Sequence, residues 1–95
     1  MRFIVNNLIY DTDKAELVAE GNRKYEVYNT LFKTTIYPVR KTSLYRTQKD
    51  NYFFVYKGDY ETMYCEPADE ATAKKFLMQN NYDKYAELYG ELEEA

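Results

Sequence analysis

Residues 52–57, Tyr-Phe-Phe-Val-Tyr-Lys, constrain the fold more than any other part of the chain, because both faces of this run are apolar or aromatic as far as Tyr56. A strand with one face in water alternates polar and apolar side chains, so a strand of this kind has to be covered on both faces. Residues 43–47 are also β-prone, and only the polar residues 48–51 separate the two runs. Two such arms around a short polar connection predict a β-hairpin. We therefore expect residues 52–57 in the interior of an antiparallel sheet.

Further strand signals surround this hairpin. Arg2–Val5 and residues 8–10 flank Asn6 and Asn7, which tolerate positive φ and suit a tight type I′ turn. Residues 15–20 alternate in character and predict a strand closed by Gly21 and Asn22, with a short helix over residues 13–19 as the alternative. More strands are expected in residues 24–28, 30–39 and 60–66. Proline cannot donate a backbone hydrogen bond, so Pro38 marks the end of the strand at 30–39 and Pro67 the end of the strand at 60–66.

The last third of the chain predicts helices. Asp69 is a good N-cap, and an apolar stripe at helical spacing follows it, formed by Ala73, Phe76, Leu77 and Asn80. A second short helix is expected over residues 83–89, ended by Gly90. Strands followed by helices predict an α+β fold, a small antiparallel sheet of about four to six strands with one or two C-terminal helices packed on it. We expect a single domain over residues 1–95, mainly β over 1–66 and helical over 68–90, with an acidic tail at 91–95.

The reactive side chains favour a protein without catalytic activity. The chain has no His and one Cys, so it lacks the imidazole of nucleophilic triads and of common metal sites. Cys65 alternates with Tyr64 and Glu66, and we interpret it as a small buried hydrophobic residue. The few glycines form no phosphate-binding loop, and Asp11 and Asp13 lack the ligand spacing of a calcium loop. We expect no cofactor and no metal.

The location expected from these residues is a reducing cytoplasm. No stretch approaches the 18 apolar residues of a membrane-spanning helix, so we expect no membrane association. The single Cys favours a reducing compartment.

Charge is segregated along the chain. Residues 1–57 hold ten basic and six acidic residues, whereas residues 58–95 hold three basic and ten acidic ones, which gives the net charge of −3. No acid occurs between Glu26 and Asp50. Basic side chains against phosphates, with tyrosines stacked on bases, are typical of single-stranded nucleic-acid binding. The candidate residues for that function are Lys33, Arg40, Lys41, Tyr45 and Arg46; a solvated sheet face is the simpler interpretation.

The acidic C-terminal region allows the opposite function. Asp83, Glu87 and Glu91 recur at four-residue spacing and share a helix edge, unless Gly90 ends the helix first. Such a row can imitate the phosphates of a nucleic acid and enter a basic cleft of a protein; it can also be only a solubilising tail. The chain has 12 tyrosines, more than a core this small needs, and Tyr is enriched in protein interfaces. Tyr82 and Tyr85 lie beside the acidic row, and half-buried strand positions are the alternative use of Tyr.

Four segments of the chain form a recognisable combination. They are Ile9-Tyr10-Asp11-Thr12-Asp13-Lys14-Ala15, then residues 43–54 (SLYRTQKDNYFF), residues 70–77 (EATAKKFL) and Tyr85-Ala86-Glu87-Leu88-Tyr89-Gly90. In this order they resemble a family of small proteins common on phages, plasmids and integrative elements of Firmicutes, whose pattern runs YDT-acid-x-A, TLYR-basic-basic-G-acid-aromatic-F-L, EEA-x-x-W and YEE-x-FG. Two departures are a Gly-rich stretch reduced to Lys57-Gly58-Asp59 and Phe76 in place of Trp.

The resemblance implies an accessory protein of a mobile element, among which anti-CRISPR inhibitors are frequent. We therefore expect a non-enzymatic inhibitor that binds a host CRISPR effector, such as a Cas nuclease with or without its guide. It would occlude the nucleic-acid site with Asp83, Glu87, Glu91, Tyr82 and Tyr85. The alternative is a nucleic-acid-binding accessory protein that uses the basic segment at residues 33–49. The sequence leaves the oligomeric state open.

Overall fold

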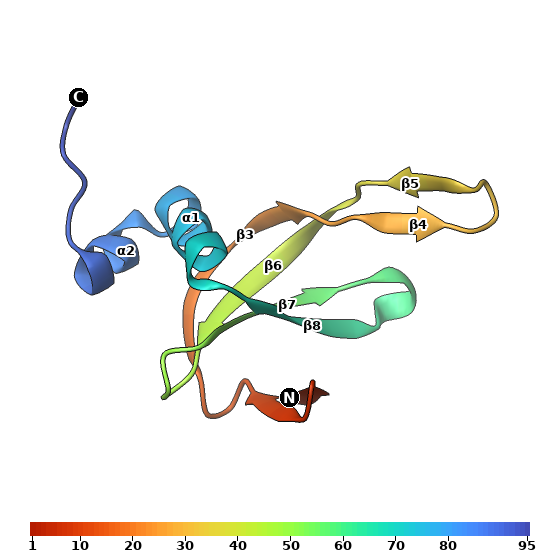
Figure 1. The fold of residues 1–95 in the computed structure, drawn as a ribbon, viewed down its shortest axis with the longest axis horizontal. Coiled ribbons are helices and arrows are strands. Elements are labelled where there is room, and N and C mark those ends of the chain that lie inside the picture. Colours follow the sequence, from red (N-terminus) through yellow and green to blue (C-terminus); the bar gives the residue numbers. More distant parts are fainter.

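Eight strands and two α-helices make up the computed structural model, which describes residues 1–95. The strands form three antiparallel sheets, and the largest has the order β3-β6-β7-β8 (Figure 1). The α+β prediction is confirmed. The elements are β1 (Arg2–Val5), β2 (Leu8–Asp11), β3 (Glu16–Lys24), β4 (Val27–Asn29), β5 (Thr34–Ile36), β6 (Val39–Arg46), β7 (Tyr52–Lys57), β8 (Met63–Ala68), α1 (Glu70–Asn80) and α2 (Tyr82–Tyr89), with a 3-10 turn at Asp59–Glu61.

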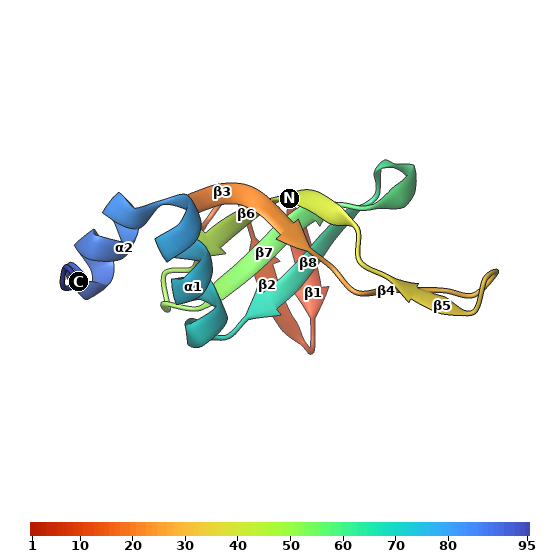
Figure 2. The ribbon, with the colours of Figure 1, turned by 90° about the horizontal axis from the view of Figure 1, so that it is seen from above.

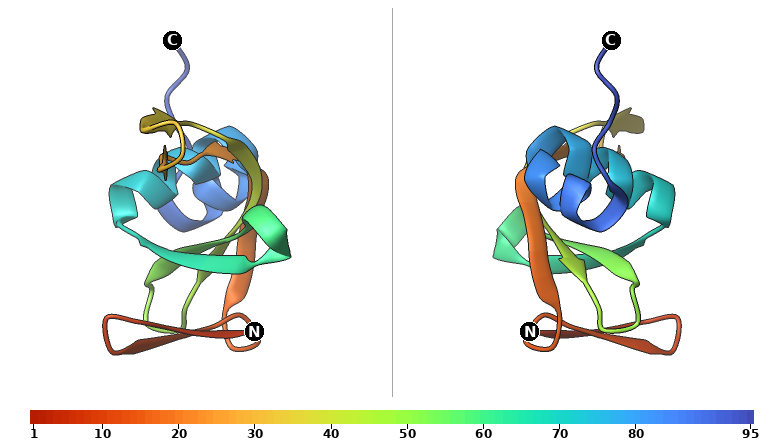
Figure 3. Two further views of the ribbon diagram at one scale, coloured as in Figure 1. Left: turned by 90° about the vertical axis from the view of Figure 1, so that its right-hand side faces the viewer. Right: turned by 90° about the vertical axis from the view of Figure 1, so that its left-hand side faces the viewer.

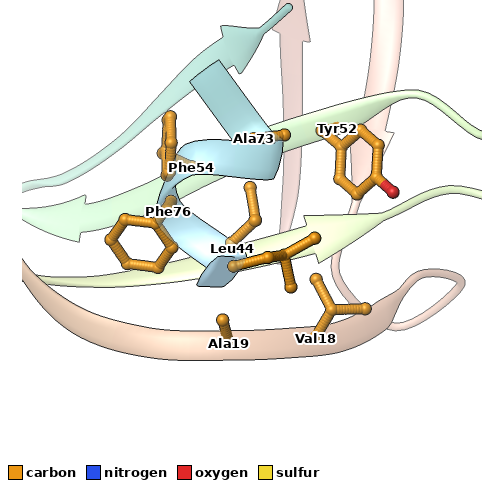
Figure 4. Packing of buried hydrophobic residues seen from close by; sticks show 8 residues of the cluster. Val18, Ala19, Leu44, Tyr52, Phe54, Ala73 and Phe76 are labelled. Atoms are coloured by element: carbon orange, nitrogen blue, oxygen red, sulfur yellow. The ribbon is translucent and has the colours of Figure 1, made fainter. Parts of the chain in front are cut away.

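The molecule has three layers, with the four-stranded sheet in the middle (Figure 3). Strand β7 is an inner strand, and Phe53 and Phe54 on its two faces are both completely buried. Phe54 packs with Leu44 and with Phe76 and Leu77 of α1 on one face (Figure 4). On the other face, Phe53 and Val55 pack against Tyr10 of the N-terminal β1–β2 hairpin. The central position predicted for residues 52–57 is therefore confirmed.

Local sequence rules account for the N-terminal hairpin and for the start of α1. Asn6 (φ 51°) and Asn7 (φ 64°) both take the left-handed conformation, as a type I′ turn requires. The Oδ1 of Asp69 accepts a hydrogen bond from the backbone N–H of Thr72 at 2.7 Å, which confirms it as the N-cap. This bond stabilises the ionised carboxylate and lowers the pKa of Asp69.

Strand β3 corrects two expectations. The predicted alternation of buried and exposed side chains is wrong, because a β-bulge lies between Leu17 and Ala19. As a result, Val18 and Ala19 are both buried and Leu17 is exposed. The strand also continues through Gly21 to Lys24 instead of ending there, and no helix forms at residues 13–19. The Asn80 side chain of α1 lies over Gly21: a Cβ at this position would be 2.0 Å from the Asn80 Oδ1, so a larger residue would have to displace that side chain.

The two prolines act in different ways. Pro67 does not end the β region but pairs with Phe53 inside β8, which is an edge strand, where a missing N–H is tolerated. Pro38 does interrupt the ladder between β3 and β6, so residues 24–28 and 30–39 are not single strands. Beyond this break the two segments of the chain pair again as β4 and β5, which form a separate two-stranded ribbon.

The helices and this ribbon lie at opposite ends of a molecule that measures 47 × 35 × 20 Å (Figures 1 and 2). Helix α2 begins at Tyr82, one residue before the predicted start, and ends before Gly90, whose φ of +90° is unfavourable for other residues. Ala68 belongs to β8, so the helical region begins at Glu70 rather than at residue 68. Residues 91–95 are exposed and form no regular structure.

Candidate functional site

Helix α2 carries part of the acidic row predicted from the sequence and is tied to the body at both ends. The Asn81 side chain donates a hydrogen bond to the Val18 carbonyl at 2.8 Å and accepts one from the Lys84 N–H at 3.2 Å. At the other end of the helix, the hydroxyls of Tyr89 and Tyr52 lie 2.6 Å apart. These contacts fix the direction in which the acidic side chains project.

Only part of the predicted acidic row lies on one helix edge. Asp83 and Glu87 are exposed on α2, but Glu91 lies beyond Gly90, which ends the helix. The Glu87 carboxylate is 3.3 Å from the Lys84 ammonium, which also contacts Glu16 at 2.9 Å, so the charge of Glu87 is partly compensated. The carboxylates at this end that form no ion pair are Asp83, Glu91, Glu93 and Glu94.

The two tyrosines predicted beside this row differ in exposure. Tyr82 is exposed, and its hydroxyl accepts a hydrogen bond from the Leu92 N–H at 2.8 Å, which ties the C-terminal segment to the start of α2. Tyr85 stacks between Tyr82 and Tyr89, with ring centres 6.1 and 5.4 Å away, and packs against the core below α1. Tyr82 is therefore more available for a partner than Tyr85.

The predicted basic residues do not form one patch. Lys33 lies in the turn between β4 and β5, whereas the others are on β6, where strand alternation divides them. Arg40 and Arg46 lie on the face covered by the helices and pair with Asp59 at 3.2 Å and with Asp50 at 2.6 Å. Lys41 and Tyr45 lie on the opposite face, and Tyr45 stacks on Phe53 at 5.3 Å. Only Lys33 and Lys41 are exposed without an ion-pair partner.

An aromatic and charged cluster at the base of the β4–β5 ribbon was not predicted. The Arg23 Nη1 lies 3.0 Å from the Glu66 Oε2, and the guanidinium lies 4.2 Å from the centre of the Phe54 ring. Tyr25 stacks on Tyr56 at 3.8 Å, and burial raises the pKa of both phenols. Arg23 and Glu66 are 43 positions apart in the sequence, so no local pattern indicates their pairing.

Several strongly exposed apolar side chains lie on the β4–β5 ribbon, another feature that sequence reasoning missed. Leu31 and Phe32 in its turn are 81% and 73% exposed. Tyr28 and Ile36 on its strands are also exposed, as is Tyr37 just beyond β5. The sequence signal was present as an apolar pair followed by Lys33, but residues 30–39 read as a continuous strand that would bury half of its side chains.

Comparison with protein-family models, with curated proteins and with solved structures finds no match to this chain. No three Cys, Asp or Glu side chains converge in a way that could hold a metal ion. Neither α1 nor α2 has the length and apolar character needed to span a bilayer.

Proposed function

We propose that the protein is a non-enzymatic inhibitor of a CRISPR effector, such as a Cas nuclease, and that it acts in the cytoplasm of a bacterial host. Two things support this proposal: the resemblance to small proteins of mobile elements, and the acidic end formed by α2 and residues 91–95. The acidic end carries the proposal, because it indicates where a nucleic-acid-binding protein would be engaged.

The charges at this end are free to interact with a partner. Asp83, Glu91 and Glu93 are exposed and have no basic side chain within ion-pair distance. A cleft that binds nucleic acid carries Lys and Arg against the phosphates, and its field attracts carboxylates by the same interaction. A protein that places several carboxylates in such a cleft excludes the nucleic acid without any chemistry. Tyr82, beside them, would add apolar contact area.

A charge-reversal experiment tests this mechanism. The test variant carries Asp83→Lys, Glu91→Lys and Glu93→Lys, and leaves out Glu87 because of its pairing with Lys84. The control makes the same change of charge at exposed carboxylates elsewhere, Glu20→Lys, Glu26→Lys and Glu61→Lys; of these three only Glu61 contacts a cation, the Lys57 ammonium at 3.9 Å. Inhibition of DNA cleavage is measured for a panel of purified, guide-loaded Cas nucleases of different types.

We expect the parent and the control variant to inhibit one of these nucleases. The test variant should inhibit it about a hundredfold less well or worse, because close charge pairs across interfaces contribute about 1.5–7 kcal/mol each. Equal inhibition by the test variant and the parent would rule out the acidic end as the binding element. The nucleic-acid-binding alternative predicts salt-dependent binding of the parent to naked DNA or RNA, weakened by Lys33→Glu with Lys41→Glu.

A further inference from the structure

The β4–β5 ribbon is an arm that projects from the body of the protein (Figures 1 and 2). Its tip carries the exposed apolar side chains of Leu31 and Phe32. We define the arm as residues 27–36 and its tip as Leu31, Phe32 and Lys33. All three tip residues are exposed. Monomeric proteins rarely expose large contiguous apolar patches, and such a patch commonly marks a protein-binding surface.

Hydrogen bonds order the tip. The Oδ1 of Asn29 accepts from the backbone N–H groups of Leu31 at 3.0 Å and Phe32 at 3.2 Å. Lys33 takes a φ of +52° and closes the turn, and Asn29 then pairs with Thr34 across the ribbon. The two apolar side chains are thus held in a defined loop, which lowers the entropy lost when they enter a partner.

The base of the arm is fixed to the sheet. The Tyr25 N–H donates a hydrogen bond to the Pro38 carbonyl at 3.0 Å, and the Tyr25 hydroxyl lies 2.8 Å from the Thr42 Oγ1. The Tyr25 ring is buried and stacks on Tyr56. The arm therefore projects from a rigid base.

Charge selects the kind of partner. Lys33 is the only charged residue of the arm, and no acid occurs from Val27 to Lys49. At the base of the arm the exposed charges of Lys24 and Glu26 oppose each other, so Lys33 alone sets the charge of the tip. A pocket that receives this tip therefore gains from carboxylates at its rim. An anionic membrane fits less well, because the arm supplies one cation and the whole chain has a net charge of −3.

We propose that the tip of the arm inserts Leu31 and Phe32 into an apolar pocket with an acidic rim on a partner protein. This contact is independent of the acidic end, which lies at the opposite end of the molecule (Figure 1). It also does not depend on the identity of the target as a nuclease. Leu31 and Phe32 supply the binding energy, and Lys33 supplies attraction to the rim.

A display library of random 12-residue peptides provides a probe that needs no knowledge of the host. The whole protein is immobilised, enriched peptides are synthesised, and their dissociation constants are measured by fluorescence anisotropy at two salt concentrations. We expect the enriched peptides to combine large apolar residues with Asp or Glu. Leu31→Asp and Phe32→Asp should each weaken binding about thirtyfold or more, the size of a hot-spot effect.

Further variants separate the two parts of the tip. Lys33→Glu should weaken binding and reverse its salt dependence, so that added salt strengthens the residual binding. The control is Ile4→Asp, because Ile4 on β1 is as exposed as Phe32, at 73%, and lies outside the arm. It should leave binding unchanged. Circular dichroism checks that each variant is folded.

Four results would overturn the proposal. The first two are that no peptide is enriched, or that the enriched peptides lack acidic residues. The third is that the tip substitutions leave peptide binding unchanged. The fourth is that the tip binds phosphatidylglycerol vesicles or a second copy of the chain in place of peptides. The nuclease assay is a separate measurement. If Leu31→Asp loses peptide binding but still inhibits, the tip contact stands and serves a partner other than the nuclease.

Discussion

Phe53 and Phe54 are neighbours in the chain, yet they belong to different cores. Phe53 packs below the sheet with Tyr10, and Phe54 packs above it with Phe76 of α1, where the two rings meet edge to face at 5.2 Å. Because each ring fills a separate layer, each substitution at this pair reports on one layer only. The stability of the helix layer can therefore be tested without disturbing the N-terminal hairpin.

Phe76→Ala should lower the free energy of unfolding by about 3–5 kcal/mol, because it removes a buried ring and leaves a cavity against Phe54. A urea titration followed by circular dichroism measures the change. Leu31→Ala is the control, since this side chain is exposed and should change stability by no more than about 0.5 kcal/mol. A loss below about 1 kcal/mol for Phe76→Ala would mean that α1 is not docked on the sheet as described.

Cys65 is the one thiol of the chain, and burial, with the charge of Glu66 beside it, raises its pKa to about 11. In the native protein it should therefore react much more slowly with a disulfide reagent at pH 8 than it does in urea. Cys65→Ala should leave inhibition unchanged if the function needs no nucleophile. A folded Cys65→Ala protein that still binds its target but no longer inhibits would contradict the non-enzymatic proposal.

Alkaline pH should destabilise the protein. Burial raises the pKa of Cys65 and also those of Tyr25, Tyr52 and Tyr56 above their ordinary values. These groups keep their protons in the folded state at a pH where the unfolded chain has lost them, so their contribution is complete below about pH 9. The free energy of unfolding should fall as the pH rises from about 9 to 11. Denaturant titrations across this range measure the free energy of unfolding, and a rise in stability would contradict the raised pKa values of these groups.

At the scale of elements, the sequence predicted what local rules decide. The turn at Asn6 and Asn7, the hairpin around residues 48–51 and the N-cap at Asp69 each depend on residues close together in the chain. The bulge in β3 and the passage of Asn80 over Gly21 depend on tertiary contacts, which no local pattern contains. The same applies to the candidate site: the charge segregation was visible, but the division of the basic residues between two faces was not.

The attachment of α2 to the sheet gives an element-scale prediction. The hydroxyls of Tyr52 and Tyr89 form a short hydrogen bond in a partly buried position, so Tyr52→Phe and Tyr89→Phe should each lower stability by about 0.5–1.5 kcal/mol. The double variant should lose less than the sum of the two, because both single changes break the same bond. Strictly additive losses in a double-mutant cycle would show that the two hydroxyls do not interact.

At the scale of the whole molecule, the body and the arm have separate tasks. All 13 buried residues lie outside residues 27–36, and the arm meets the body only at its base. The two cores, the helices and the N-terminal hairpin are therefore complete without it. The body holds the acidic end and the arm at a fixed separation. Neither of them supplies a strand to the four-stranded sheet.

Replacement of residues 27–36 by a two-residue Asn-Gly turn should leave the body folded. We expect the melting temperature to stay within about 3 °C of the parent, because no buried side chain is lost. Thermal denaturation followed by circular dichroism measures it, and heteronuclear NMR checks that the remaining residues keep their environment. A cooperative loss of structure would show that the arm is part of the folding unit.

The break in the ladder at Pro38 also has an evolutionary consequence. Because the tip lies beyond this break and none of its side chains is buried, substitutions at residues 30–32 carry almost no penalty in folding free energy, whereas Lys33 keeps the positive φ of the turn. Variants with a new tip are then as stable as their parent and differ only in what they recognise. A lineage confronted with a changing partner can diversify at these positions while the body remains constant, as antibodies vary their loops on a conserved framework.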